Sequence, residues 1–142
     1  MSITVIDYGS GNLKSAAKAL EAAAQNVNAS SKILVTSDPK IIKESDKIVL
    51  PGQGSFGDCY SGIKKIPGLN ETLNEFVLEK KKPILGICVG MQLFAKIGYE
   101  RQKTEGFGWI DAEVRKINNM NKKLKLPHMG WNEIELKKDC FL

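Results

Sequence analysis

The fold of this chain is decided by the stretch Pro83-Ile84-Leu85-Gly86-Ile87-Cys88-Val89-Gly90-Met91-Gln92. Its apolar run, 84–87, predicts a buried strand, and the residues after Cys88 are compatible with a helix. Glycines stand two residues before and two residues after Cys88, which is the spacing of a nucleophile elbow. A sharp strand-to-helix turn brings backbone close to backbone, so both flanking positions favour a residue without a Cβ atom.

This spacing predicts that the sulfur of Cys88 stands clear at the carboxyl end of a sheet. The N–H groups at the helix start, beginning with that of Val89, would then point toward an oxyanion formed there. The alternative is that Cys88 closes the strand as one more small buried residue, because a Gly-x-Cys-x-Gly match is short. The local pattern leaves both interpretations open.

Length and composition indicate one globular domain. A chain of 142 residues with 42% hydrophobic residues can bury a sizeable core. No apolar run approaches the roughly 18 residues of a membrane span, and the start of the chain lacks the features of a signal peptide. The three cysteines, Cys59, Cys88 and Cys140, are an odd count without paired spacing, which indicates free thiols in a reducing compartment. We therefore expect a cytoplasmic protein without membrane association.

The net charge of +5 raises the question of a nucleic-acid partner. Only Arg101 and Arg115 among the 21 basic residues are arginines, whereas phosphate and base readout favour the arginine fork. We interpret the lysines as solvated surface and expect no nucleic-acid partner. His128 is the only histidine, so no Cys/His cluster for zinc exists, and we expect neither a metal nor a cofactor.

Strands and helices alternate along the first two thirds of the chain. Strands are predicted at 3–7, 32–36, 47–50 and 84–87, and helices at 13–24, from Pro39 onward, at 56–64 and at 71–80. This alternation predicts a three-layer α/β fold, in which helices cover both faces of a largely parallel central sheet. The glycine-bearing turn at 8–12 lacks the spacing of a phosphate-binding loop.

The residue pattern changes beyond Phe94. Residues 98–106 are polar and are predicted as a loop, and alternation predicts half-exposed strands at 112–117 and 134–136. No repeat or linker divides the chain, so residues 1–142 are predicted to form a single domain.

A second glycine-rich turn follows the strand at 47–50. Gly52 and Gly54 straddle Gln53, which frees the backbone to turn and to present N–H groups to an anion. Taken alone, this segment is better explained as a plain strand-to-helix turn. In parallel sheets, however, ligands bind at the carboxyl ends of the strands, where both this turn and Cys88 fall.

Separated segments of the chain together resemble one family. Gly86-Ile87-Cys88-Val89-Gly90-Met91-Gln92 resembles the nucleophile motif of class I (triad-type) glutamine amidotransferases, and Pro51-Gly52-Gln53-Gly54 resembles their oxyanion-strand motif. Within that family, the glutaminase subunits of imidazole glycerol phosphate synthases are similar in two further segments, Asp7-Tyr8-Gly9-Ser10-Gly11-Asn12 and Pro127-His128-Met129-Gly130-Trp131-Asn132. The resemblance covers the whole chain, and the combination is far more specific than any one segment.

The resemblance implies a glutaminase that needs no cofactor. Cys88 would attack the side-chain amide of glutamine, release ammonia and form a glutamyl thioester that water hydrolyses. Val89 and the Gln53–Gly54 peptide, once oriented, would donate N–H groups to the oxyanion. Gln92 would contact the bound glutamine, and Glu100 falls where the family often carries a carboxylate for the substrate amine.

The resemblance also implies a heterodimer with a (β/α)₈ cyclase subunit. The cyclase would use the ammonia to make imidazole glycerol phosphate and AICAR in histidine biosynthesis. Residues expected at or near the interface are Asn12, His128, Met129, Gly130, Trp131 and Asn132. An alternative is a paralogue that supplies ammonia for amidation of surface-polysaccharide sugars, because the segment 108–114 is similar to that branch.

The catalytic triad of the family is incomplete in these 142 residues. Family members carry a His and a Glu in a His-Pro-Glu-like segment near the C-terminus, and nothing here matches it. We therefore expect a chain that is incomplete at its C-terminal end and lacks the last strands and helix of the fold. By elimination His128 is a candidate base, but the resemblance places it beside the interface and the glutamine site. A non-catalytic remnant that acts only as a binding subunit is a further alternative.

Overall fold

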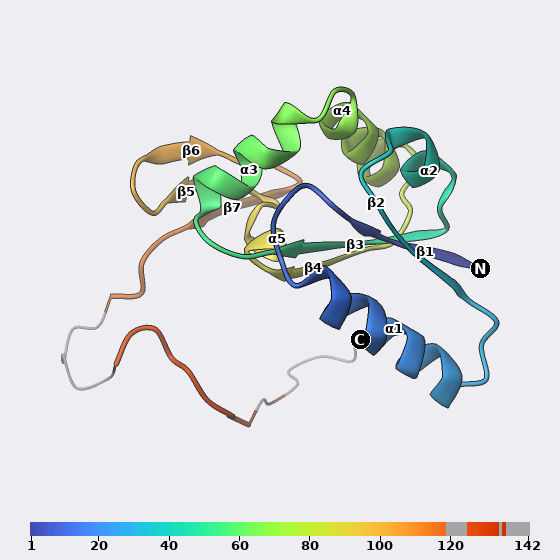
Figure 1. Ribbon diagram of the computed structural model, residues 1–142. Coiled ribbons are helices and arrows are strands. Elements are labelled where there is room, and N and C mark those ends of the chain that lie inside the picture. Colours follow the sequence, from blue (N-terminus) through green and yellow to red (C-terminus); the bar gives the residue numbers. More distant parts are fainter. Residues whose placement is uncertain (119–124, 134, 136–142) are drawn as a thin grey trace.

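A four-stranded parallel sheet forms the centre of the computed structural model, which describes residues 1–118, 125–133 and 135 (Figure 1). Its strands are β1 (Ser2–Ile6), β2 (Lys32–Thr36), β3 (Lys47–Gly52) and β4 (Ile84–Cys88). They lie in the order β2-β1-β3-β4, and each neighbouring pair is parallel. The predicted α/β class with a largely parallel sheet is confirmed.

Helices cover both faces of this sheet, as predicted. Figure 1 shows α1 on one face of the sheet and α2, α3 and α4 on the opposite face. These helices are α1 (Leu13–Asn26), α2 (Pro39–Glu44), α3 (Phe56–Lys65) and α4 (Leu69–Asn74). Side chains of Asn12, Asp38 and Ser55 accept N–H groups in the first turns of α1, α2 and α3, which explains where these helices begin. None of the helices in the described residues is both long and apolar enough to cross a bilayer.

The chain after β4 departs from the prediction. The helix behind Cys88 is the single turn α5 (Val89–Gln92). The chain then forms a second sheet of three strands, β5 (Ala95–Tyr99), β6 (Lys103–Glu105) and β7 (Ile110–Val114), in the order β6-β5-β7. The predicted loop at 98–106 was wrong, because β5 and β6 pair through antiparallel backbone hydrogen bonds that need no apolar run.

Two further boundaries differ, and one prediction cannot be compared. The strand predicted at 112–117 begins two residues earlier, at Ile110. The helix predicted at 71–80 consists of α4 followed by a π-helical turn, η1 (Glu75–Glu79). The strand predicted at 134–136 rests on residues 134 and 136, which lie outside the described residues.

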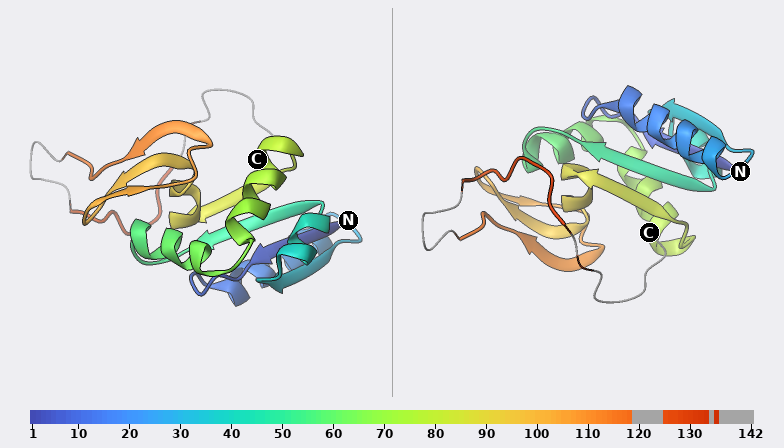
Figure 2. Two further views of the ribbon diagram at one scale, coloured as in Figure 1. Left: turned by 90° about the horizontal axis from the view of Figure 1, so that it is seen from above. Right: turned by 90° about the horizontal axis from the view of Figure 1, so that it is seen from below.

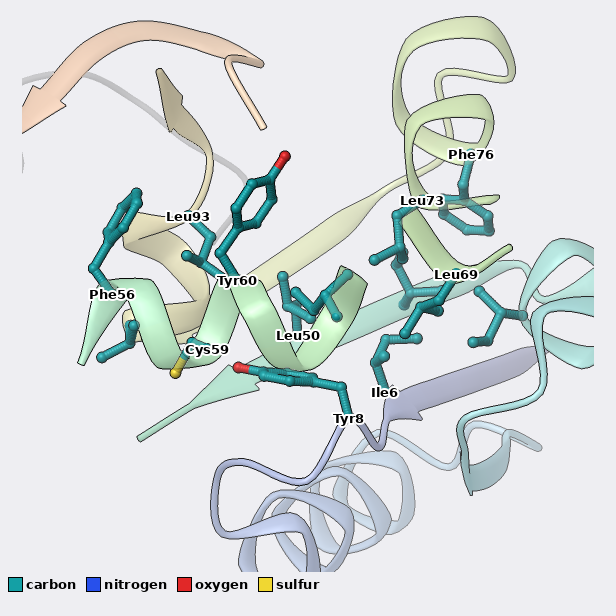
Figure 3. Packing of buried hydrophobic residues seen from close by; sticks show 14 residues of the cluster. Ile6, Tyr8, Leu50, Phe56, Cys59, Tyr60, Leu69, Leu73, Phe76 and Leu93 are labelled. Carbon is teal, nitrogen blue, oxygen red and sulfur yellow. The ribbon is translucent and has the colours of Figure 1, made fainter. Parts of the chain in front are cut away.

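The main core lies between the sheet and the layer of α2, α3 and α4 (Figure 3). Side chains of these helices meet side chains of the sheet there. The fully buried residues include Ile6 and Leu50 on strands and Ile63, Leu69, Leu73 and Phe76 in the helical layer. Burial of this apolar surface is the dominant favourable contribution to folding. The core therefore fixes the strands whose carboxyl ends carry the site.

Strand β4 is less buried than its apolar run predicts. Val5 and Val49 are buried on the sheet face that carries α1, but Leu85, their neighbour in register, is 40% exposed, as is Ile87. The prediction of a fully buried strand was wrong because β4 is the outer strand among the described residues. Helix α1 contacts β1 and β2, and Figure 2, in the view from below, shows β4 without a helix over it.

Candidate active site

The sharp turn predicted at Cys88 is present. Cys88 has a φ of 55° and a ψ of −120°, a conformation that is costly for a residue with a side chain. It ends β4 and immediately precedes α5, so the backbone reverses direction at this residue. Its thiol is free and exposed. A strained, exposed side chain on a strand-to-helix turn is the geometry of a nucleophile elbow.

Backbone contacts explain the glycines on both sides of the turn. A Cβ atom on Gly90 would overlap the carbonyl oxygen of Leu50 in β3. A Cβ atom on Gly86 would fall 2.7 Å from Cζ of Phe94 and would overlap the backbone of Met91. Close approach of α5 to β3 and β4 therefore requires glycine at these positions and holds Cys88 in place.

The turn at residues 51–54, called here the oxyanion turn, lies beside the elbow. Gly52 is the register partner of Cys88 in the parallel pair of β3 and β4. A Cβ atom on Gly52 would overlap the backbone nitrogen of Gly90, so the start of the turn packs directly against the elbow. Gly54, at the other end, has a φ of 101° and open space around it. Sequence and structure thus agree on two adjacent turns.

Three side chains from other elements hold the oxyanion turn. The Tyr8 hydroxyl donates to the carbonyl of Pro51 at 2.6 Å. The Ser10 hydroxyl accepts from the N–H of Gln53 at 2.9 Å and donates to the carbonyl of Gln53 at 2.7 Å. The Cys59 thiol donates to that same carbonyl at 3.3 Å. Burial raises the pKa of the Tyr8 phenol well above its ordinary value, so it stays a neutral donor.

The sequence analysis did not predict that Tyr8, Ser10 and Cys59 hold this turn, although the sequence contains a signal for Tyr8 and Ser10. Tyr8 and Ser10 follow β1, and Gln53 follows β3, its neighbour in the sheet. Turns that leave adjacent parallel strands at their carboxyl ends lie side by side. Cys59 comes from α3 instead, and its position could not be deduced before α3 was placed.

The two predicted glutamine ligands line one cavity of about 470 Å³. Gln92 and Glu100 share this cavity with residues from the end of β7 and with Pro127. The Glu100 carboxylate also accepts a hydrogen bond from the N–H of Phe56, at the start of α3, at 2.7 Å. Cys88 is not among the residues that line the cavity.

Val89, the second predicted oxyanion donor, begins α5. Its N–H therefore has no partner within the helix, and its side chain is buried with 6% exposed. An amide in this position can donate to an anion formed at the preceding residue. The structure thus places one backbone donor directly after Cys88.

The predicted interface residues are exposed. Met129 and Trp131 have exposed fractions of 86% and 104%, and His128, Gly130 and Asn132 are exposed with them. Asn12 caps α1 by accepting from the N–H of Ser15 at 3.2 Å. Within the described residues, no hydrogen bond links His128 to Cys88, and no group of His, Cys, Asp and Glu side chains is arranged to hold a metal ion.

Comparison with known proteins identifies the family. Residues 4–140 match the family "Glutamine amidotransferase class-I". Similar curated proteins include "Imidazole glycerol phosphate synthase subunit HisH" of Pelagibacter ubique (strain HTCC1062), 54% identical over 140 residues, and its namesake in Bradyrhizobium diazoefficiens, 49% identical over 139 residues. Each match covers 98% of this chain but only 65% and 64% of the relative, so the chain spans less than two thirds of their length. With nearly all of its residues matched, the chain belongs to the class I glutamine amidotransferase family.

Proposed function

We propose that this chain supplies the nucleophile and the oxyanion turn of a glutaminase that hydrolyses glutamine to glutamate and ammonia. The observation that carries the proposal is the conformation of Cys88. An exposed thiol with a φ of 55° is held between two glycines at the carboxyl end of a parallel sheet. In a member of the class I glutamine amidotransferase family, such a thiol is placed for attack on an amide.

The proposed reaction follows from this placement. The Cys88 sulfur attacks the side-chain amide carbon of glutamine, and a C–S bond forms while the carbonyl oxygen becomes an oxyanion. The Val89 N–H stabilises that oxyanion, and the tetrahedral intermediate collapses with cleavage of the C–N bond. Ammonia leaves with a proton delivered to its nitrogen, and water hydrolyses the thioester to give glutamate and the free thiol.

A general base is required to take the thiol proton and return it to the leaving nitrogen. The family resemblance assigns this role to a His paired with a Glu. Among the described residues, no imidazole is hydrogen-bonded to Cys88. We propose that His128 instead lies near the glutamine site, since its neighbour Pro127 lines the cavity with Gln92 and Glu100.

That cavity is the proposed binding site for the substrate. Glu100 offers a carboxylate for the amine of glutamine, and Gln92 offers an amide for hydrogen bonds. One oxygen of Glu100 is engaged by the Phe56 N–H, which fixes the orientation of the carboxylate. The apolar side chains of Val114, Ile117 and Leu126 in the same lining suit the methylene groups of an amino acid.

We further propose a heterodimer with a (β/α)₈ cyclase subunit. The relatives are named as subunits of imidazole glycerol phosphate synthase, and a cyclase partner would use the ammonia as a nitrogen source in making imidazole glycerol phosphate and AICAR in cytosolic histidine biosynthesis. Met129 and Trp131 are large, apolar and exposed, as interface anchors are before a partner binds. Asn12 and the segment 128–132 form the proposed interface.

The names of the relatives favour this pathway over the polysaccharide paralogue. Rescue of a histidine auxotroph that lacks this subunit distinguishes the two. Growth without histidine supports the proposal, and failure of a folded, expressed protein that still hydrolyses glutamine to restore growth favours the paralogue.

A glutaminase assay of the native polypeptide with its cyclase partner tests the catalytic assignment. Wild type is compared with Cys88→Ala, and Cys59→Ser serves as a matched control because it replaces the buried thiol with a hydroxyl that can still donate to the Gln53 carbonyl. We expect ammonia release from wild type and the control and none from Cys88→Ala. Equal release from all three would refute the role of Cys88 and leave a non-catalytic binding subunit as the better explanation.

A further inference from the structure

We propose that Phe56 is a positioning residue that orients the Glu100 carboxylate and thereby sets the preference of the site for a substrate with an α-amino group. The inference rests on the proposed function, in which Glu100 binds the amine of glutamine. It adds a residue to which neither the family match nor the relatives' names assign a role.

The ring of Phe56 fixes the distance between α3 and the hairpin of β5 and β6. Phe56 is the first residue of α3 and is only 1% exposed (Figure 3). A Cβ atom on Gly98, in β5, would overlap the ring, and a Cβ atom on Gly106, just after β6, would fall 3.0 Å from its Cζ. Both strands of the hairpin therefore lie directly against this one side chain.

The backbone of Phe56 holds Glu100, which directly follows β5 in the same hairpin. Oε2 of the Glu100 carboxylate accepts from the N–H of Phe56 at 2.7 Å. An N–H at the first position of a helix has no partner within the helix, and a negative charge is favourable there. The ring of Phe56 thus places the hairpin, and its N–H orients the carboxylate that the hairpin carries.

A second contact between the same two elements is weaker. Nη1 of Arg101 lies 3.8 Å from Oδ2 of Asp58 in the first turn of α3, and their side chains are 79% and 75% exposed. Exposed ion pairs of this kind contribute little to stability. The position of Glu100 therefore depends mainly on Phe56.

The location of Glu100 gives this constraint its consequence. Glu100 lines the cavity of about 470 Å³ that contains Gln92, and it also lines a second cavity, of about 310 Å³, beside the start of α3. Without the Phe56 contact, the carboxylate could turn toward the second cavity. With Oε2 held by Phe56, Oε1 accepts no other hydrogen bond in the described part of the chain and is left for an ammonium group.

A pair of substrates measures recognition of the amine. L-Glutamine is compared with 4-carbamoylbutanoate, which has the same amide and carboxylate but no α-amino group, in the native polypeptide with its cyclase partner. The ratio of the two kcat/KM values reports the preference for the amine, because a general loss of activity or stability affects both substrates alike. Glu100→Ala should lower this ratio by about ten- to hundredfold, the factor that a hydrogen bond to a charged group provides.

Two changes at Phe56 separate its ring from its N–H. Phe56→Leu keeps the N–H but packs less tightly against the hairpin. Replacement of Phe56 by 3-phenyllactic acid keeps the ring and puts an ester oxygen in place of the N–H. Each change should lower the ratio by about three- to tenfold, the factor of one net hydrogen bond. KM for glutamine should rise while kcat is kept, because binding of the amine is weakened rather than the chemistry.

Phe76→Leu is the matched control. Phe76 is also 1% exposed, but it lies in η1 and lines neither cavity. The control should lose stability as Phe56→Leu does and keep the wild-type ratio. Folded Phe56 variants with the wild-type ratio would overturn the positioning role, as would a Phe76→Leu variant that lowers the ratio equally.

The inference and the proposed function fail in different ways. A wild-type protein that releases no ammonia from glutamine would overturn the proposed function. Turnover of glutamine with a ratio that the Phe56 changes leave unaltered would overturn the inference alone. An unaltered ratio in Glu100→Ala would also overturn the inference, because Phe56 would then orient a carboxylate that does not bind the amine.

Discussion

The elbow at Cys88 and the oxyanion turn at 51–54 lie side by side but are held by different forces. The elbow is fixed by backbone packing, because a Cβ atom at Gly86 or Gly90 would overlap neighbouring main chain. The oxyanion turn is fixed only at its start, and side-chain hydrogen bonds from Ser10 and Cys59 hold its middle. Packed backbone has few alternative arrangements, whereas a few hydrogen bonds exchange readily. The comparison indicates that Cys88 has a fixed position, whereas the turn beside it can adjust.

The largest effect is expected from substitution of Cys88, the proposed nucleophile. Cys88→Ser should lower ammonia release by at least about 10³-fold, because a serine hydroxyl is far less ionised and less nucleophilic than a thiol at neutral pH. Glutaminase turnover with the cyclase partner measures this, and circular dichroism checks that the fold is kept. Activity within tenfold of wild type would show that the elbow does not carry the chemistry.

The packing of the elbow is tested by Gly90→Ala. The added methyl group would overlap the Leu50 carbonyl, so β3 and α5 must separate, and we expect a loss of about 3 kcal/mol in the free energy of unfolding. Denaturant titration measures the loss. A loss below 1 kcal/mol would mean that the elbow can relax and is not held by its backbone.

The matched substitution in the oxyanion turn is Gly54→Ala. Nothing lies within contact distance of the new methyl group, so only the φ of 101° opposes it, at a cost of about 1–2 kcal/mol. The same titration compares the two alanine variants. If Gly54→Ala lowers the free energy of unfolding as much as Gly90→Ala does, the two turns are not held in different ways.

The smallest effect on the free energy of unfolding is expected from Cys88→Gly. Glycine adopts a φ of 55° without strain, so the variant should gain up to about 1 kcal/mol of stability while it loses all activity. The gain would show that the elbow stores strain for function. A destabilised Cys88→Gly would indicate instead that the Cys88 side chain contributes packing.

Much of the elbow and of the parallel sheet could be predicted because their signals are local. Glycines two residues on each side of Cys88 reveal backbone contact before any partner is known. The alternation of strands and helices likewise predicts the parallel sheet. The hydrogen bonds between Ser10 and Gln53 could not be predicted, since they join residues 43 positions apart through the pairing of β1 with β3.

The incorrect predictions have two different physical causes. The apolar run of β4 predicted burial on both faces, but its exposure depends on which elements lie over it, and α1 contacts β1 and β2 instead. The second sheet was missed for the opposite reason. Strand β6 is short and polar, and β5 is a five-residue strand that contains Gly98, so backbone pairing rather than a long apolar run makes them strands.

Affinity labelling tests the central claim most directly. The native polypeptide with its cyclase partner is treated with a chloroketone analogue of glutamine, and the modified peptide is identified by mass spectrometry. We predict one adduct, on Cys88, whose formation excess glutamine suppresses, while the buried Cys59 stays unmodified. Labelling of other cysteines at the same rate, or labelling of Cys88 that glutamine does not suppress, would contradict the assignment of this elbow as a glutaminase nucleophile.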